Sequence, residues 1–270
     1  MKTQKNERSN SVGYLKNVAL GIICAFGLYS VPASAQVRGD VGLNGNPNQV
    51  FTGRTVTTQD EGVTQLSISG AQRRAGDERL NTLMARAAYG ITNSLQAQVS
   101  VPVDIYDQSS GYSAQTGVSR LEGGLTYQVT GKSEPLSLAA GMNIEVPLEG
   151  RQNNVIGEQP SAGPTFKPNL QLGTGMGFTT MYADVEAELG QDVRGLNYSI
   201  GAQTPVGAFR PALELNARTK ESSSPEFYAT PGVFYSVSSA AEIGVGAAIG
   251  LNDRSDDSRI SAQFNMTLGR

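Results

Sequence analysis

The acidic residues Asp184, Glu186 and Glu188 come closest to a reactive site in this sequence, by their type and their spacing. Carboxylates can bind a metal ion, and a pair of them can act as general acid and general base. Alternate residues of a β-strand lie roughly 6.6 to 7 Å apart, however, so each of the three would need a partner strand to converge on one ion. We therefore predict no metal site, no cofactor site and no catalytic residue.

The residue types that are missing exclude several classes of enzyme. The chain of 270 residues has no His and no Trp, and its single Cys is Cys24. Without imidazole there is no Ser-His-Asp hydrolase, no His-ligated zinc centre and no His proton shuttle. Because Cys24 precedes the predicted mature chain, disulfides, Cys nucleophiles and thiolate metal sites are excluded as well.

The N-terminus predicts export. A basic stretch precedes an apolar run from Val18 to Leu28, and Ala33-Ser34-Ala35 forms an A-x-A cleavage site. The run is too short to span the roughly 30 Å of bilayer hydrocarbon as a helix, so we expect residues 1–35 to be a cleaved signal peptide. Removing its four basic residues and one acidic residue leaves 17 Lys and Arg against 23 Asp and Glu. The resulting charge of −6 argues against nucleic acid as a partner.

The mature chain changes character at about residue 62. Residues 36–62 are rich in Gly, Asn, Thr and Pro and show no sustained periodicity, so we predict a flexible N-terminal segment. From residue 63 to residue 270, apolar residues alternate with polar or small ones, with a period of two. In Pro135–Leu148, six of the seven even positions are large apolar residues. Each predicted strand therefore has one apolar face and one face that carries charge or small residues.

The alternation predicts about twelve strands, joined by alternately short and long connections. Strands of about 10 to 13 residues exceed the usual mode of about five or six and match a tilted span of a bilayer. Short turns at one end and longer polar loops at the other are typical of outer-membrane barrels. We predict an all-β, transmembrane antiparallel up-and-down β-barrel of about 12 strands over residues 63–270, with a periplasmic or secreted β-sandwich as the alternative. The predicted strands are 63–73, 79–91, 94–105, 116–129, 135–148, 164–177, 179–190, 194–204, 207–218, 226–237, 239–251 and 257–268.

The charged face of a closed barrel lines its lumen. A twelve-stranded barrel is only modestly wider than the eight-stranded kind whose interior side chains just fill it, so opposite charges on strands one or two apart are expected to pair. These charges form either a salt-bridge network that neutralises the interior or a pore lining that selects solutes by size and charge. Glycine runs at 173–177 and 244–250 place small residues in the lumen, where they open space or ease bending. The predicted lumen-lining residues are Arg86, Arg120, Glu122, Glu145, Lys167, Asp184, Glu186, Glu188, Arg210, Glu214, Arg218, Glu242 and Arg259.

Three stretches resemble a known family. Residues 89–103, Tyr-Gly-Ile-Thr-Asn-Ser-Leu-Gln-Ala-Gln-Val-Ser-Val-Pro-Val, resemble the hairpin motif YGLTD-x-L-x-x-x-V-x-x-P of the outer-membrane transporter-like family named after the meta-pathway of phenol degradation. Residues 119–127 are similar to the strand that follows in that family, and residues 242–253 to its penultimate strand. The likeness spans most of Leu80 to Leu268, but the chain ends at Arg270 without the usual terminal aromatic residue. The resemblance implies a channel for small aromatic or apolar compounds and supplies no catalytic residues.

These observations predict a channel or transporter-like barrel in the outer membrane of a Gram-negative bacterium, for passive passage of small solutes. The alternative is a structural or adhesive barrel with a plugged lumen. The expected partners are outer-membrane lipid, lipopolysaccharide, small solutes and the barrel-assembly machinery, without a cofactor. Enzymatic barrels of this size resemble His-dependent hydrolases, so the lack of His favours a protein that is not an enzyme.

Overall fold

The computed structural model describes most of the chain from residue 51 onward. The described residues are 51, 54, 56–75, 78–107, 115–118, 120–131, 134–148, 163–191, 194–221, 224–255 and 258–269. The predicted signal peptide, residues 1–35, and residues 36–50 of the predicted N-terminal segment lie outside them. In this part of the chain, no helix is long and apolar enough to cross a membrane.

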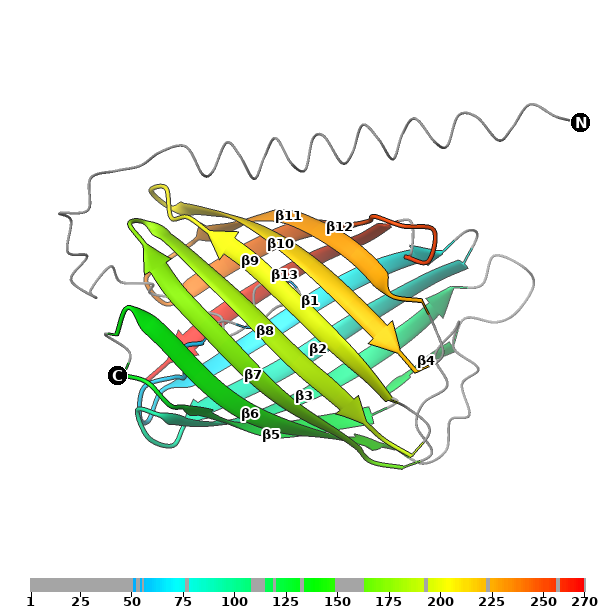
Figure 1. Ribbon diagram of the computed structural model, residues 1–270, viewed down its shortest axis with the longest axis horizontal. Helices are drawn as coiled ribbons and strands as arrows, with labels where there is room; N and C mark the ends of the chain where they lie inside the picture. The colour runs from blue at the N-terminus through cyan, green and yellow to red at the C-terminus, as the bar shows by residue number, and fades with distance from the viewer. Residues whose placement is uncertain are drawn as a thin grey trace, which may run out of the picture. The chain divides into compact units, whose positions relative to one another are not determined.

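Within the described residues, thirteen β-strands form one antiparallel sheet (Figure 1). The strands are β1 (Thr64–Ala75), β2 (Glu78–Gly90), β3 (Leu95–Asp107), β4 (Gln115–Val118), β5 (Arg120–Gln128), β6 (Leu136–Pro147), β7 (Thr165–Met176), β8 (Thr179–Leu189), β9 (Arg194–Gln203), β10 (Phe209–Lys220), β11 (Glu226–Ser236), β12 (Ala241–Gly250) and β13 (Ser258–Leu268). β4 and β5 together follow the predicted strand 116–129, and each of the other strands follows one predicted strand.

The sheet closes on itself as a barrel. β1 pairs antiparallel with β2 on one side and with the last strand, β13, on the other. β4 and β5 both pair with β3 and lie on either side of residue 119, so together they run along the height of the barrel once. Thirteen strands therefore make twelve crossings. The predicted all-β barrel and its strand number are confirmed, and a sandwich of two separate sheets is excluded.

The connections differ between the two ends of the barrel. At one end, the short-turn rim, Gly177 and Phe178 alone join β7 to β8. Gly177 has a φ of 62°, a left-handed conformation that glycine adopts without strain in a tight turn. At the other end, the long-loop rim, residues 148–164 separate β6 from β7. Two connections at that rim are short as well: residues 76–77 between β1 and β2, and residues 190–193 between β8 and β9.

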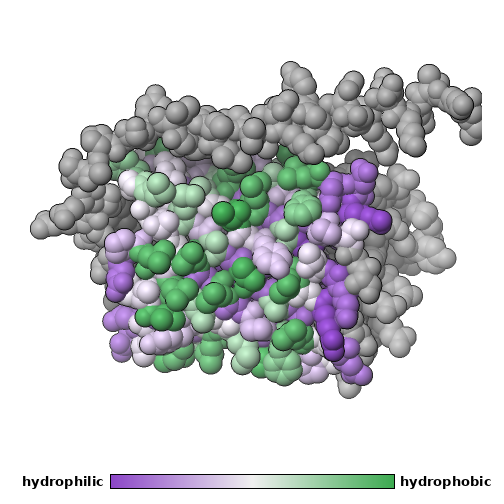
Figure 2. Space-filling model, in the orientation of Figure 1, coloured by the Kyte–Doolittle hydropathy of each residue, from purple (hydrophilic) through white to green (hydrophobic). Residues whose placement is uncertain are grey.

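Burial along the strands is the reverse of that in a water-soluble protein. On β6, Met142 is 50% exposed, whereas the adjacent Asn143 is 0% exposed. Apolar side chains spread over the outer face of the strands, and hydrophilic ones gather at one rim (Figure 2). Gln96, Glu214 and Glu242 are among the largest fully buried side chains. An apolar exterior around a polar interior is what lipid tails require of a barrel that spans them.

Candidate functional site

The predicted lumen-lining residues stand on the strand faces that carry the buried polar side chains. Most of them fall on two parts of the barrel. The β5–β7 wall carries Arg120, Glu122, Glu145 and Lys167. The β8–β12 wall carries Asp184, Glu186, Glu188, Arg210, Glu214, Arg218 and Glu242. Arg86 on β2 and Arg259 on β13 lie on the strands between these walls.

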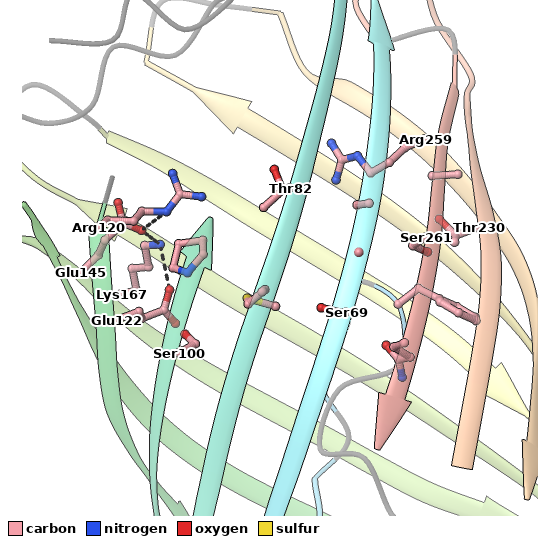
Figure 3. Close-up of a pocket in the computed structure, with 17 residues that line it drawn as sticks. Ser69, Thr82, Ser100, Arg120, Glu122, Glu145, Lys167, Thr230, Arg259 and Ser261 are labelled. Atoms are coloured by element: carbon pink, nitrogen blue, oxygen red, sulfur yellow. Dashed lines mark hydrogen bonds and ion pairs between the residues drawn. The ribbon is translucent and has the colours of Figure 1, made fainter. Parts of the chain in front are cut away.

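On the β5–β7 wall, one lysine joins two carboxylates. Glu122 on β5 and Glu145 on β6 are direct partners in the strand register, an arrangement in which like charges repel. Lys167 Nζ lies 2.5 Å from Glu145 Oε2 and 3.4 Å from Glu122 Oε2. Arg120 Nε lies 3.6 Å from the same Glu145 oxygen. Two cations and two anions thus form one partly exposed cluster, whose contacts are drawn in Figure 3.

On the β8–β12 wall, Arg210 and Glu242 form a buried pair across β11. Arg210 Nη2 lies 2.6 Å from each carboxylate oxygen of Glu242, and Nη1 donates to Gln203. The guanidinium also stacks over the Phe234 ring, 4.2 Å from its centre. Charge-assisted bonds of this kind are strong in a dry environment. The pair therefore holds three neighbouring strands together from the inside.

Glu188 and Arg218 extend this wall toward the long-loop rim. Arg218 Nη2 lies 3.5 Å from Glu188 Oε2, across β9. Asn197 on β9 donates to the other Glu188 oxygen at 2.9 Å. Here, as between Arg210 and Glu242, the paired charges lie two strands apart.

Arg86 and Arg259 make contacts of other kinds. Arg86 donates a hydrogen bond to Gln98 on β3, and Gln98 Nε2 donates in turn to Asn143 Oδ1 on β6 at 2.6 Å. The Arg259 guanidinium lies 5.7 Å from the centre of the Tyr228 ring. Polar contacts therefore continue along the inner face from β2 to β6.

The described part of the N-terminal segment lies inside the barrel. At the short-turn rim, the Gly62 N–H donates to the Gly90 carbonyl at 2.9 Å. Further in, the Gln59 N–H donates to Gln96 Oε1 at 2.9 Å, and Thr58 Oγ1 donates to Gln128 Oε1 at 3.1 Å. Gln59 Nε2 also donates to Gln65 Oε1 at 3.0 Å. These bonds fix residues 58–62 against β1, β2, β3 and β5.

Phe51 fills a slot that glycines open in the wall. Gly232 on β11 and Gly246 on β12 are direct partners in the register. A Cβ atom at Gly232 would lie 2.1 Å from the Phe51 ring, and one at Gly246 would lie 2.9 Å from it. The ring stacks on Phe234 with centroids 4.8 Å apart. The sequence predicts that such glycines open space in the lumen, and this space holds an aromatic ring together with the buried residues Tyr182, Ala212 and Phe234.

Glu214 lies beside this slot. Its carboxylate is fully buried and accepts the Tyr182 hydroxyl at 2.7 Å. The same oxygen accepts the Phe51 backbone N–H at 3.0 Å. Gly201 on β9 leaves room for the Tyr182 ring to reach across, since a Cβ there would lie 2.3 Å from the Tyr182 hydroxyl oxygen. The wall therefore presents an acceptor beside an aromatic surface.

Arg54 supplies a positive charge to the acidic residues of β8. Its guanidinium forms an ion pair with Glu186. Burial disfavours the charged form of Arg54, but the nearby carboxylates of Glu186, Asp184 and Glu122 outweigh burial and raise the pKa of Arg54 above its ordinary value. Asp184 is buried as well, and its Oδ1 has no hydrogen-bond partner.

Four residues of this site lie outside the predicted set: Phe51, Arg54, Tyr182 and Phe234. One signal for Arg54 was present in the strand register. Asp184 and Glu186 pair only with Gln, Asn and Ser residues on β7 and β9. These two carboxylates therefore have no cation as a direct partner in the register, and Arg54 of the N-terminal segment supplies one to Glu186. Among the residues that the structure describes, no group of three acidic side chains could hold a metal ion.

A cavity of about 190 Å³ remains on the long-loop side of Phe51 (Figure 3). The β5–β7 cluster lines one side of it, and Arg259 and Ser261 on β13 line another. Phe51 and small residues such as Gly70 complete the lining. The cavity thus places charged, polar and aromatic groups around one space.

Comparison with known proteins identifies the fold. No protein-family model matches the sequence, and no curated protein sequence matches it. An outer membrane channel from Pseudomonas putida F1 aligns with a TM-score of 0.59 and 12% identity, over 82% of this chain and 100% of that one. The fold is that of outer-membrane channels and porins.

Two porins support the same assignment. The NanC porin aligns with a TM-score of 0.54 and 10% identity, over 76% of this chain and 100% of its own. The KdgM porin, solved with disordered oligogalacturonate, aligns with a TM-score of 0.52 and 10% identity, over 76% of this chain and 99% of its own. These matches show the same barrel fold, and they do not confirm the narrower resemblance to the meta-pathway family.

Proposed function

We propose that this protein is an outer-membrane channel for the passive passage of small solutes. The observation that carries the proposal is a closed barrel with an apolar exterior and ionisable side chains around an internal cavity. The apolar exterior suits contact with lipid tails, whereas a lining of ionisable side chains suits water and dissolved solutes. In outer-membrane barrels the short turns face the periplasm, so the long-loop rim faces the outside.

A solute that comes from the long-loop rim first meets the β5–β7 wall. Arg120 and Glu122 are partly exposed there, and the cluster offers both signs of charge. Next it meets Phe51 and Arg54, which belong to the N-terminal segment. The β5–β7 wall therefore sorts solutes by charge, and the segment sets the largest size that passes.

The solute class follows from two observations. The motifs at residues 89–103 and 242–253 support membership of the meta-pathway family and, with it, small aromatic or apolar solutes. Phe51 lines the cavity and gives the route an aromatic ring on which such a solute can stack, with the buried Phe234 ring stacked behind it. Export by residues 1–35, insertion by the barrel-assembly machinery and contact with lipopolysaccharide belong to the same proposal. The proposed activity is transport and not catalysis.

A structural or adhesive barrel with a plugged lumen is the second candidate. The contacts of the segment favour it, because Phe51, Arg54, Thr58 and Gln59 are each bonded to the barrel wall. A segment that never leaves these partners would seal the lumen.

Liposome swelling with the refolded full chain separates the two functions. A channel gives swelling in arabinose and slower swelling in the larger stachyose, and the double variant Phe51→Ala/Arg54→Ala narrows that difference. A heat-modifiable gel shift on the same samples verifies that the barrel is closed. No swelling by either closed barrel in either sugar contradicts the channel and establishes the plugged barrel.

A further inference from the structure

The slot in the β8–β12 wall is shaped for a flat ring. Gly232 and Gly246 leave no side chain on its floor, and a Cβ at either position would overlap the ring of Phe51. Phe234 forms one side of the slot and stacks on Phe51 with an angle of 22° between the ring planes. Ring stacking in such a slot is favourable beyond the burial of apolar area. The wall therefore selects an aromatic group.

Next to this slot the wall presents carboxylates. Glu214 is fully buried and accepts the Phe51 N–H, and Glu186 pairs with the Arg54 guanidinium. Asp184 lies between them along the wall, buried, with one oxygen that has no hydrogen-bond partner. A buried acceptor without a donor is costly, so the site has capacity for a further donor. The second group that the wall selects is therefore a hydrogen-bond donor with a positive charge.

The segment shows which ligand satisfies both requirements. It brings an aromatic ring, an N–H group and a guanidinium to this wall. An anionic aromatic compound would meet Glu214, Asp184 and Glu186. The nearby cations already have partners: Arg210 is bonded to Glu242 and Gln203, Lys167 to Glu145, and Arg86 to Gln98. A neutral hydrocarbon would leave the buried carboxylate of Glu214 without the donor that Phe51 now provides.

We infer that this slot, with Phe51 and Arg54 displaced, is a binding site for small solutes that carry an aromatic ring and a cationic nitrogen. The inference rests on the proposed channel function and names the solute class. The N-terminal segment competes with such a solute as part of the same chain, because Phe51 and Arg54 occupy the slot and the carboxylates beside it. A short tether gives an effective concentration of about a millimolar, so a free solute binds the native protein weakly and a variant with the segment displaced more tightly.

Isothermal titration of the full chain in detergent tests the site with three probes. The first probe, 2-phenylethylamine, carries an aromatic ring and a positive charge. Phenylacetate carries the ring with a negative charge, and butylamine carries the positive charge without a ring. We expect 2-phenylethylamine to bind Phe51→Ala/Arg54→Ala about tenfold or more tightly than it binds the native chain, as loss of the tethered competitor requires. Phenylacetate and butylamine bind neither protein measurably. Equal binding of all three probes, or no gain in the variant, overturns the site.

Variants of the wall make the test specific. In the same double-variant background, Gly246→Ala fills the slot, because the atoms nearest to its added Cβ in the native chain all belong to the Phe51 ring. Glu214→Gln removes the charge, and each change is expected to abolish the gain for 2-phenylethylamine. The matched control is Gly70→Ala, where an added Cβ has no neighbour within 4 Å. Should Gly246→Ala bind the amine as well as the control does, the slot is not the site.

Liposome swelling on the same samples keeps the two hypotheses apart. Amine binding by a barrel that gives no swelling contradicts the channel and leaves the site in place. Swelling without amine binding supports the channel and overturns the site. The heat-modifiable gel shift verifies closure of each variant, and the altered residues 51 and 54 lie outside the strands that close the barrel.

Discussion

The two charged walls of the lumen use the same residue types at the same alternate spacing, but water reaches them differently. On the β8–β12 wall, the side chains of Arg210 and Glu242 are 7% and 3% exposed. On the β5–β7 wall, the side chains of Arg120 and Glu145 are 37% and 20% exposed. The aromatic cluster, including Phe51 of the N-terminal segment, covers the first wall, whereas the second borders the cavity.

The difference separates the buried Arg210–Glu242 pair from the partly exposed contacts of Arg120. A buried ion pair costs several kcal/mol to break, because the remaining charge stays away from water. A partly exposed pair contributes about 1 kcal/mol or less. We propose that the salt-bridge network and the pore lining, which the sequence leaves as alternatives, are both present in one lumen: Arg210 and Glu242 belong to the network, and the β5–β7 cluster belongs to the pore lining.

The largest effect is expected from Arg210→Ala. It leaves Glu242 buried without its cation and should lower the free energy of unfolding by about 3 to 5 kcal/mol. Urea unfolding of the barrel in liposomes, followed by the heat-modifiable gel shift, measures the loss. Arg194→Ala serves as the control, because its ion pair with Glu221 is exposed at the rim. Equal midpoints for the two variants would contradict the distinction between buried and exposed ion pairs.

A smaller effect is expected from Gly246→Val. The new side chain overlaps the Phe51 ring and should weaken docking of the segment by about 1 to 3 kcal/mol, as overpacking does elsewhere. The bilayer conductance should rise while the urea midpoint of the barrel changes little. Gly70→Ala, with no neighbour near the added Cβ, should leave both unchanged. A conductance that stays at the native value argues that Phe51 does not narrow the path.

Arg120→Ala should change selectivity more than stability. Arg120 is partly exposed at the cavity, so its loss should cost about 1 kcal/mol or less. Removing a cation from the lining should move the reversal potential in a salt gradient toward cations, and Arg120→Lys should restore it. An unchanged reversal potential together with a large loss of stability would place Arg120 among the structural charges.

The smallest effect is expected from alkaline pH on the Arg54 contact. The pKa of Arg54 is raised above its ordinary value, so the stabilisation it gives is present below that ordinary value and is lost only above the raised one. Docking of the segment should therefore be constant from about pH 7 to about pH 9. The ratio of native conductance to that of Arg54→Ala reports this docking. A ratio that falls steadily across this range contradicts a charged, paired Arg54.

The barrel could be predicted because its signal is local. In Pro135–Leu148 the alternation gives β6 one apolar face and one polar or small face, and the same period of two recurs along the chain. Strand length and loop pattern, which are also local, place the apolar face outside. The inward position of Arg210 and Glu242 follows from the same alternation.

The content of the lumen could not be predicted in that way. Residues 36–62 have no periodicity, and Phe51 finds its acceptor, Glu214, 163 positions further along the chain. The slot depends on two glycines that meet only through the register of β11 and β12. The glycine run at 244–250, which includes Gly246, indicates space in the lumen, but it does not say what fills the space.

Single-channel conductance of the native chain and of Phe51→Ala/Arg54→Ala tests the central claim most directly, with Glu61→Ala, an exposed position of the same segment, as the control. The claim is that this barrel is a channel narrowed by its own N-terminal segment. We expect small unitary currents from the native chain and the control, and clearly larger ones from the double variant. Equal currents from all three closed barrels, or silence from all three, would contradict it.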